Sequence, residues 1–246
     1  MNATLSTTAG GAGQLVTTQW ALVVTAAEID SPKAKAALGE LYSIYCYPVY
    51  AFIRRRGYGR EDAQDLTQDF FVHLWQKNTL SRADPQRGRF RNFLLGALDH
   101  FLAHAAERAQ TQKRGGGYVL VSLDEEAAEA RYQVAVLRGL SAHKIFEMRW
   151  ASALIEAAID RLRREMEAED KGHLFQALQG YLVGDEEASY QQTAAALGLT
   201  LATIKAAIHR MRTRYRVLLR AEIARTAATT DEVEEELRYL RASLRS

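Results

Sequence analysis

The sequence is poor in cysteine and lacks long apolar segments. Its single cysteine, Cys46, cannot form an internal disulfide, which fits a protein of a reducing compartment. No run of eighteen apolar residues occurs, so we expect no segment to cross a membrane. The opening residues carry no lysine or arginine ahead of an apolar stretch and do not form a secretory signal. These absences predict a cytoplasmic protein that begins with a loose leader.

The chain also has little net charge. Its 32 lysines and arginines nearly balance 30 aspartates and glutamates, which leaves a formal charge of +2. The hydrophobic content of 48% and the charged content of 25% are typical of a folded protein. A protein that binds DNA unaided usually carries a larger positive charge. We therefore expect any basic, DNA-binding segment to work beside a partner that supplies most of the affinity.

Helical periodicity dominates the chain, and almost no segment alternates as a strand would. Ser31 and Pro32 have the chemistry of a helix start, whereas the glycines after Arg114 interrupt the helical pattern. We expect an all-α fold with two helical domains joined by a flexible linker, the second containing a helix-turn-helix. The expected divisions are a leader (1–17), a front domain (18–111), the linker (112–145), a rear domain (146–228) and a C-terminal helical tail (229–246).

The segment 189–220 predicts the helix-turn-helix. Gly198 supplies the left-handed turn position between two helices, and Thr200 caps the second helix. This register puts the small residue Ala194 where the helices cross. It also predicts four buried positions, at Leu197, Leu199, Ile204 and Ala207.

The second of these helices is strongly basic. From Leu201 to Arg220 there are six lysines and arginines and no acid. A helix that enters the major groove of DNA needs cations for the phosphates and no carboxylate to repel them. A solvated basic helix in an ordinary bundle is the alternative interpretation.

An acidic stripe marks the front domain. On a helix over 61–77, Asp62, Asp65 and Asp69 fall on one narrow face, with Gln68 beside them. Like charges at this spacing weaken a helix slightly. The stripe is tolerable if it is solvated, and it is useful if a basic partner docks there.

Several separated motifs follow one another along the chain. They are DAQDLTQDFF at 62–71, RFRNFL at 89–94, VSLDE at 121–125, and LGLT, TIK and HR between 197 and 210. In that order they resemble four segments of the extracytoplasmic-function (ECF) group of sigma-70 family RNA polymerase sigma factors. These segments are the core-polymerase-binding helix, the promoter-melting helix, the interdomain linker and the helix-turn-helix that reads the −35 element. The resemblance covers residues 18–225.

The resemblance implies site residues in both domains. It implies binding of core RNA polymerase through Asp62, Asp65, Leu66, Gln68, Asp69 and Phe70. It implies contacts with melted DNA of the −10 element through Arg89, Arg91, Asn92, Phe93, His100, His104 and Arg108. It implies contacts with −35 DNA through Thr200, Thr203, Lys205, Ala206, His209, Arg210, Arg212 and Arg214. Phe93, His100 and Ala206 stand where the family usually has tryptophan, asparagine and serine, so the promoter sequence does not follow.

The residues alone leave some alternatives open. Helical spacing favours core positions for Phe93 and Phe101 over stacking on bases. His100 and His104 lie one turn apart, with Glu107 a further three residues on, but they lack the glutamate of a zinc-binding HExxH motif. We expect no metal, no cofactor and no enzymatic activity. The tail predicts an amphipathic helix that either packs on its own domain or docks a regulator.

The sequence thus predicts a sigma factor whose partners are core RNA polymerase and promoter DNA. A restraining, anti-sigma-like protein is a further candidate partner. The main alternative is a self-sufficient helix-turn-helix regulator that dimerises through its front helices. A helical adaptor without DNA contact is a third class, and binding to core polymerase separates the sigma factor from both.

Overall fold

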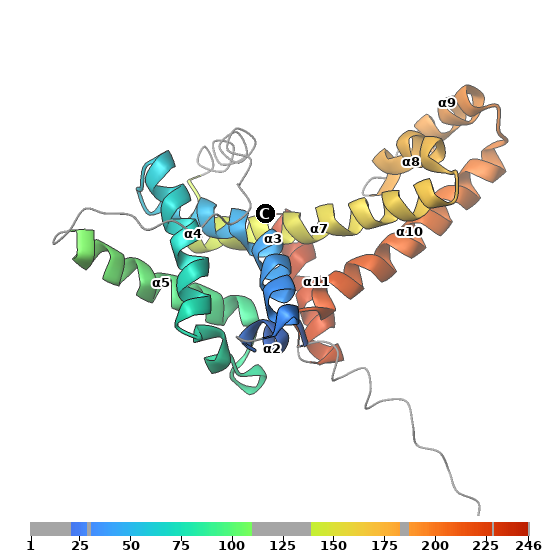
Figure 1. Ribbon diagram of the computed structural model, residues 1–246. Helices are drawn as coiled ribbons and strands as arrows, with labels where there is room; N and C mark the ends of the chain where they lie inside the picture. Colours follow the sequence, from blue (N-terminus) through green and yellow to red (C-terminus); the bar gives the residue numbers. More distant parts are fainter. Residues whose placement is uncertain (1–20, 29–30, 110–138, 183–186, 228, 246) are drawn as a thin grey trace, which may run out of the picture. The chain divides into compact units, whose positions relative to one another are not determined.

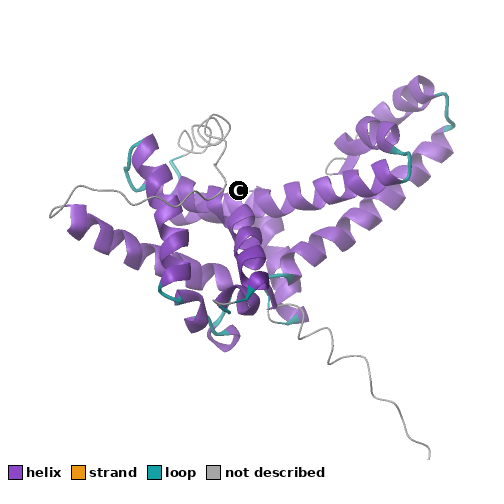
Figure 2. Ribbon diagram, in the orientation of Figure 1, coloured by secondary structure: helices purple, strands orange, loops and turns teal. Residues whose placement is uncertain are grey.

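The computed structural model describes residues 21–28, 31–109, 139–182, 187–227 and 229–245, and these segments contain helices and turns but no strand (Figures 1 and 2). The all-α prediction is therefore confirmed. The predicted leader and the part of the predicted linker before residue 139 lie outside the described residues. No helix in the described segments has the length and apolar character needed to cross a membrane.

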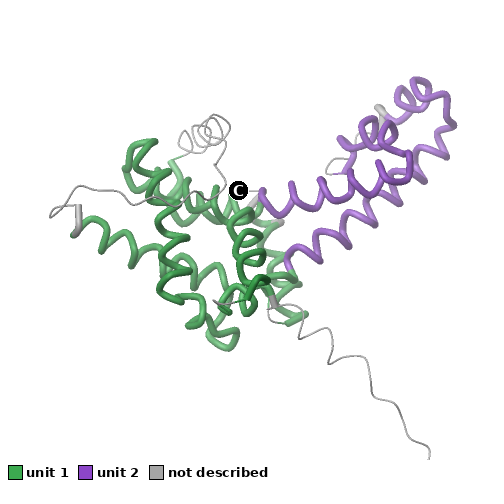
Figure 3. Tube along the Cα trace, viewed as in Figure 1, with its two compact units in different colours: residues 1–151, 224–246 green, residues 152–223 purple. Residues whose placement is uncertain are grey.

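The chain divides into two compact units (Figure 3). Unit 1 comprises residues 1–151 and 224–246, and unit 2 comprises residues 152–223. The sequence instead places the boundary of the rear domain at residue 146 and treats the tail as a separate segment. In the structure, the first turns of helix α7 (Ala142–Ala168) and the tail both belong to unit 1.

Unit 1 is built mainly from α2 (Ala21–Ala27), α3 (Pro32–Arg55), α4 (Arg60–Gln76), α5 (Phe90–Ala109) and α11 (Thr230–Arg245), with 3-10 turns η1 (Thr79–Arg82) and η2 (Pro85–Arg87). The start of α3 is the predicted one, because the Ser31 hydroxyl accepts a hydrogen bond from Lys33 N at 3.2 Å and Pro32 follows as the first helical residue. The short helix α2 is not predicted from the sequence.

The core of unit 1 gathers aromatic side chains from several helices. The ring of Tyr45 in α3 meets Phe90 of α5 edge to face at 5.5 Å, and it stacks on Phe146 of α7 at 6.3 Å. The rings of Phe70 in α4 and Phe101 in α5 also contact each other, in a tilted arrangement with centroids 5.5 Å apart. Burying such rings is the main stabilising contribution to a fold of this kind. Because this stripe of α5 faces the core, the rest of the helix surface is left for function.

The tail forms a capped, amphipathic helix within unit 1. The Thr229 hydroxyl accepts a hydrogen bond from Glu232 N at 3.2 Å, as the sequence predicts for the cap. Val233, Leu237 and Leu240 are buried, so the predicted apolar stripe packs against the protein. Of the two alternatives for the tail, the structure shows packing within the protein, in the unit that contains the front helices.

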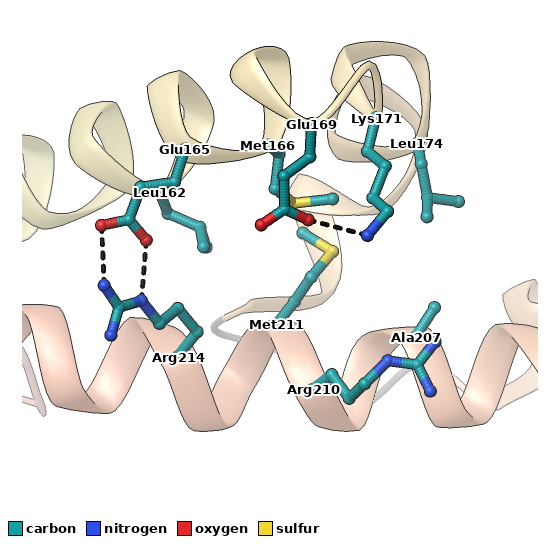
Figure 4. A pocket seen from close by; sticks show the side chains of 10 residues that line it. All are labelled: Leu162, Glu165, Met166, Glu169, Lys171, Leu174, Ala207, Arg210, Met211 and Arg214. Carbon is teal, nitrogen blue, oxygen red and sulfur yellow. Dashed lines mark hydrogen bonds and ion pairs between the residues drawn. The ribbon is translucent and has the colours of Figure 1, made fainter.

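Unit 2 contains the remainder of α7, α8 (Gly172–Leu178), η3 (Gln179–Leu182), α9 (Glu187–Leu197) and α10 (Leu201–Ala224). Helices α7 and α10 enclose a pocket of about 240 Å³ lined by Met166 and Met211 (Figure 4). At one end of it Arg214 donates two hydrogen bonds to Glu165, at 2.7 and 2.8 Å. This bidentate pair connects the two helices at the surface.

The turn between α9 and α10 has the predicted chemistry. Gly198 adopts a φ of 65°, and Leu199 N donates to Ala194 O at 2.9 Å, which closes the end of α9. The Thr200 hydroxyl then accepts from Thr203 N at 3.2 Å and caps α10. Ala194 is buried as predicted, but Leu199 is 40% exposed and does not take the buried position expected for it.

The four buried positions that the sequence predicts here thus have different outcomes. Ile204 and Ala207 are buried, Leu197 is half-buried, and Leu199 is exposed. The two buried residues lie inside α10, where helical spacing fixes the face they occupy. The other two lie at the turn, where helical spacing no longer determines which way a side chain points.

Candidate functional site

The acidic stripe lies on the exposed face of α4. Asp62, Asp65 and Asp69 are exposed, and within the described part of the chain Asp62 and Asp65 form no ion pair. The opposite face is fixed in the core by Ala63 and Phe70, both fully buried. This arrangement presents the carboxylates of Asp62 and Asp65 to a partner without using them to hold the fold.

Three other predicted polymerase-binding residues take different places. Leu66 and Gln68 are half-buried at the edge of the stripe. Phe70 contributes no surface, and its ring packs against Phe71 at 5.6 Å. We conclude that Phe70 orients α4 from the core, because a buried ring cannot contact a partner directly.

A second feature of unit 1 is a pocket of about 590 Å³ between α4, η1 and α5. Three of the residues predicted to contact −10 DNA line it from α5, namely Asn92, Phe93 and His100. Phe93 is half-buried and its ring stacks on buried Phe90 at 6.1 Å, so it is neither a core residue nor a free platform. Phe101, by contrast, is a core residue, as its helical spacing favours.

The opposite wall of this pocket was not found from the sequence. It is formed by His73, Lys77, Thr79 and Arg82. These residues occupy the end of α4 and the following turn, where no periodic pattern marks them. The pocket thus combines an aromatic ring, an amide, two imidazoles and two cations, which are groups that stack on an unpaired base and bind a phosphate.

The histidine pair of α5 extends from the edge of this pocket. His100 and His104 lie with their Nε2 atoms 3.2 Å apart, and His104 Nδ1 lies 3.1 Å from Glu107. The described segments contain no group of three or more histidine, cysteine or acidic side chains that could hold a metal ion. Nothing is described of the Arg108 side chain.

Arg89 and Arg91 are not placed on the exposed polar face that the sequence predicts. Arg89 Nη2 lies 2.7 Å from Glu235 and its Nε lies 3.2 Å from Glu236 of α11. Arg91 is only 4% exposed and pairs with the buried carboxylate of Glu236. In this structure both arginines of the predicted DNA surface are engaged within unit 1.

In unit 2, one exposed, basic face of α10 has Ala206 and His209 at its centre and the cations Lys205 and Arg210 at its margins. Ile204 and Ala207 face the core, whereas Ala206 and His209 lie on the opposite, exposed side. The predicted residues that are exposed on or beside this face are Thr200, Thr203, Lys205, Ala206, His209 and Arg210. A smooth strip with cations at its margins suits a helix that approaches a groove between two rows of phosphates.

Two further predicted contacts of α10 have partners within unit 2. Arg212 Nε donates to Tyr181 O at 2.8 Å, and Arg214 forms the bidentate pair with Glu165. The hydrogen bonds from Arg214 lower the pKa of Glu165. Both arginines therefore connect α10 to neighbouring elements of its own unit.

Comparison with known proteins gives one match. The family model described as ECF sigma factor matches residues 51–221. Searches of curated proteins and of solved structures gave no match. The matched segment runs from α3 to α10, so it includes the acidic stripe, the pocket and the basic face but ends before α11.

Proposed function

Because the chain belongs to the ECF sigma factor family, we propose that it binds core RNA polymerase and directs it to promoters with a −10 and a −35 element. Proteins of this family are transcription initiation factors and not enzymes, so the chain serves in transcription initiation. The observation that carries the finer proposal is that the family match spans all three of the surfaces described above. The proposed place of action is the cytoplasm, where core polymerase and DNA are found.

The acidic stripe on α4 is the proposed contact with core polymerase. Asp62, Asp65 and Asp69 offer three exposed carboxylates on one helix face. Complementary charge steers a partner and fixes its register more than it adds affinity. A basic helical surface on the polymerase is the partner that this stripe fits.

The pocket between α4 and α5 is the proposed site for a base of the opened −10 element. Phe93 supplies the stacking surface, and Asn92 and His100 supply hydrogen-bonding groups for the base edge. Lys77 and Arg82 supply charge for the neighbouring phosphates. A base can reach such a pocket only after leaving the duplex, so binding here favours strand opening.

The exposed face of α10 is the proposed contact with the −35 element. Lys205 and Arg210 lie at its two margins and reach phosphates, while Ala206 and His209 lie nearest the bases. A restraining, anti-sigma-like protein is a further proposed partner. It would act by covering these surfaces.

The test uses the double variant Asp62→Asn with Asp65→Asn. Its matched control is Glu28→Gln with Asp231→Asn, which removes two charges from exposed positions elsewhere in unit 1. We expect the stripe variant to bind core polymerase at least about tenfold more weakly, equivalent to about 1.4 kcal/mol. Its melting temperature should change little, because relief of like-charge repulsion offsets the loss of the Asp62 carboxylate from the first turn of α4. Unchanged affinity for core polymerase would contradict the proposal.

A further inference from the structure

The start of α5 and the tail helix meet through an ion-pair network. Arg89 contacts both Glu235 and Glu236, and Arg91 contacts Glu236. These partners are far apart in the chain, since 145 residues separate Arg91 from Glu236. Two cations of the predicted promoter-melting helix are thus occupied by two carboxylates of α11.

Aromatic rings enclose the inner arginine on two sides. The Arg91 guanidinium carbon lies 4.6 Å from the ring centre of Trp150 and 4.4 Å from that of Tyr239. Tyr239 belongs to α11, so the tail supplies both a carboxylate and one wall of this enclosure. A guanidinium group stacks on aromatic faces and also binds phosphate.

Two polar atoms of this enclosure also lack hydrogen-bond partners in the part of the chain that the structure describes. Arg91 Nε and Trp150 Nε1 are buried and have no hydrogen-bond partner among the described residues. Buried donors without partners destabilise the state that contains them. Moreover, a helix of 16 residues such as α11 is only marginally stable without packing. The polar part of the α11 contact therefore lowers the free energy needed to release the tail, while Val233, Leu237 and Leu240 hold its apolar face.

We propose that α11 is an intramolecular clamp whose carboxylates occupy the position of DNA phosphates at Arg89 and Arg91. The proposal rests on the function proposed above, since it concerns the same −10 surface. Carboxylate and phosphate are the two anions that a guanidinium binds bidentately, so they compete for one site. Opening of promoter DNA on α5 then requires α11 to leave. The family match ends at residue 221, so the clamp lies outside the segment shared with the family.

The experiment measures binding of the full chain, without polymerase, to a mixed-sequence single-stranded DNA of about 12 nucleotides, a length within the usual site size of such proteins. The clamp variant is Glu235→Gln with Glu236→Gln, which keeps the shape of both side chains. Its control is Glu28→Gln with Glu61→Gln, at exposed positions outside α11, which changes the net charge of unit 1 equally. We expect the clamp variant to bind about tenfold tighter, within the range of ordinary coupling energies, and the control to change little.

A third variant identifies where the gain arises. Adding Arg89→Ala, at a position only partly buried, to the clamp variant should reduce the gain, because only Arg91 then remains to bind a phosphate. If the clamp variant binds no tighter than the control, or keeps its full gain without Arg89, the inference is overturned. Binding of core polymerase is measured on the same proteins, because it depends on α4. If the wild-type chain does not bind core polymerase, the proposed function is overturned. If it binds core polymerase but the clamp variant shows no gain in DNA binding, only the clamp is overturned.

Discussion

Glu236→Ala is the substitution whose effect on stability follows most directly from the structure. It removes the carboxylate that pairs with Arg91 and leaves a cation that is 4% exposed. Removing one member of a buried ion pair typically costs about 3–5 kcal/mol, because the remaining charge loses its hydrogen-bonded partner in a site with little water. Burial already lowers the pKa of Arg91, which shows how poorly this environment solvates the cation.

The comparison is an ion pair at the surface. Glu165→Ala removes the partner of Arg214, and the two side chains are 32% and 49% exposed. Exposed pairs contribute at most about 1 kcal/mol, since water replaces the missing carboxylate. The two glutamate-to-alanine changes should therefore differ by at least about 2 kcal/mol in unfolding free energy, the difference between those two ranges.

Urea unfolding followed by tryptophan fluorescence and by circular dichroism measures this difference. Trp150 lies against Arg91, so its share of the fluorescence of the three tryptophans reports on this site. In Glu236→Ala we expect the fluorescence change at clearly lower urea than in Glu165→Ala. A fluorescence change that precedes the loss of helix would show that α11 leaves first. Equal midpoints for the two variants would refute the argument that Glu236 neutralises a buried cation.

Three further predictions concern other parts of the chain. Burial raises the pKa of Cys46 to about 11, so its thiol should resist a disulfide reagent near neutral pH until urea unfolds the protein. Burial also raises the pKa of Tyr45 from 10.0 to about 12, so its contribution to stability is complete below pH 10 and is lost as the pH rises towards 12. The share of Tyr45 in the free energy of unfolding should accordingly fall by roughly 2–3 kcal/mol over that interval, and Tyr45→Phe should remove this part of the loss. Replacing Lys205 and Arg210 with alanine should reduce the salt dependence of holoenzyme binding to −35 DNA by about one unit per lost phosphate contact, whereas Arg164→Ala on α7 should not.

The features that the sequence predicts correctly are those set by neighbouring residues. Ser31 with Pro32 and Gly198 with Thr200 define helix ends through local hydrogen bonds and backbone preferences, so their positions in the chain are sufficient. The apolar stripe that includes Phe101 is likewise fixed by helical spacing.

The features that it misses depend on contacts between distant segments. Periodicity shows that α11 has an apolar face, but it does not show which helix that face meets. Arg91 and Glu236 carry no mark of their pairing across 145 residues, so Arg91 looks like a solvent-facing cation. The pocket also needs Arg82 beside Phe93, and only the tertiary fold brings the turn after α4 next to α5.

The central claim is that this chain gives core RNA polymerase its promoter specificity. The direct measurement is transcription in vitro from genomic DNA, with core polymerase alone, with the wild-type chain and with Asp62→Asn/Asp65→Asn, followed by mapping of start sites. We expect a defined set of start sites that appears only with the wild-type chain, shares two sequence elements upstream, and is much reduced with the stripe variant. Start sites that are the same with and without the chain, together with tight sequence-specific binding of the chain alone to duplex DNA, would contradict it in favour of a self-sufficient regulator.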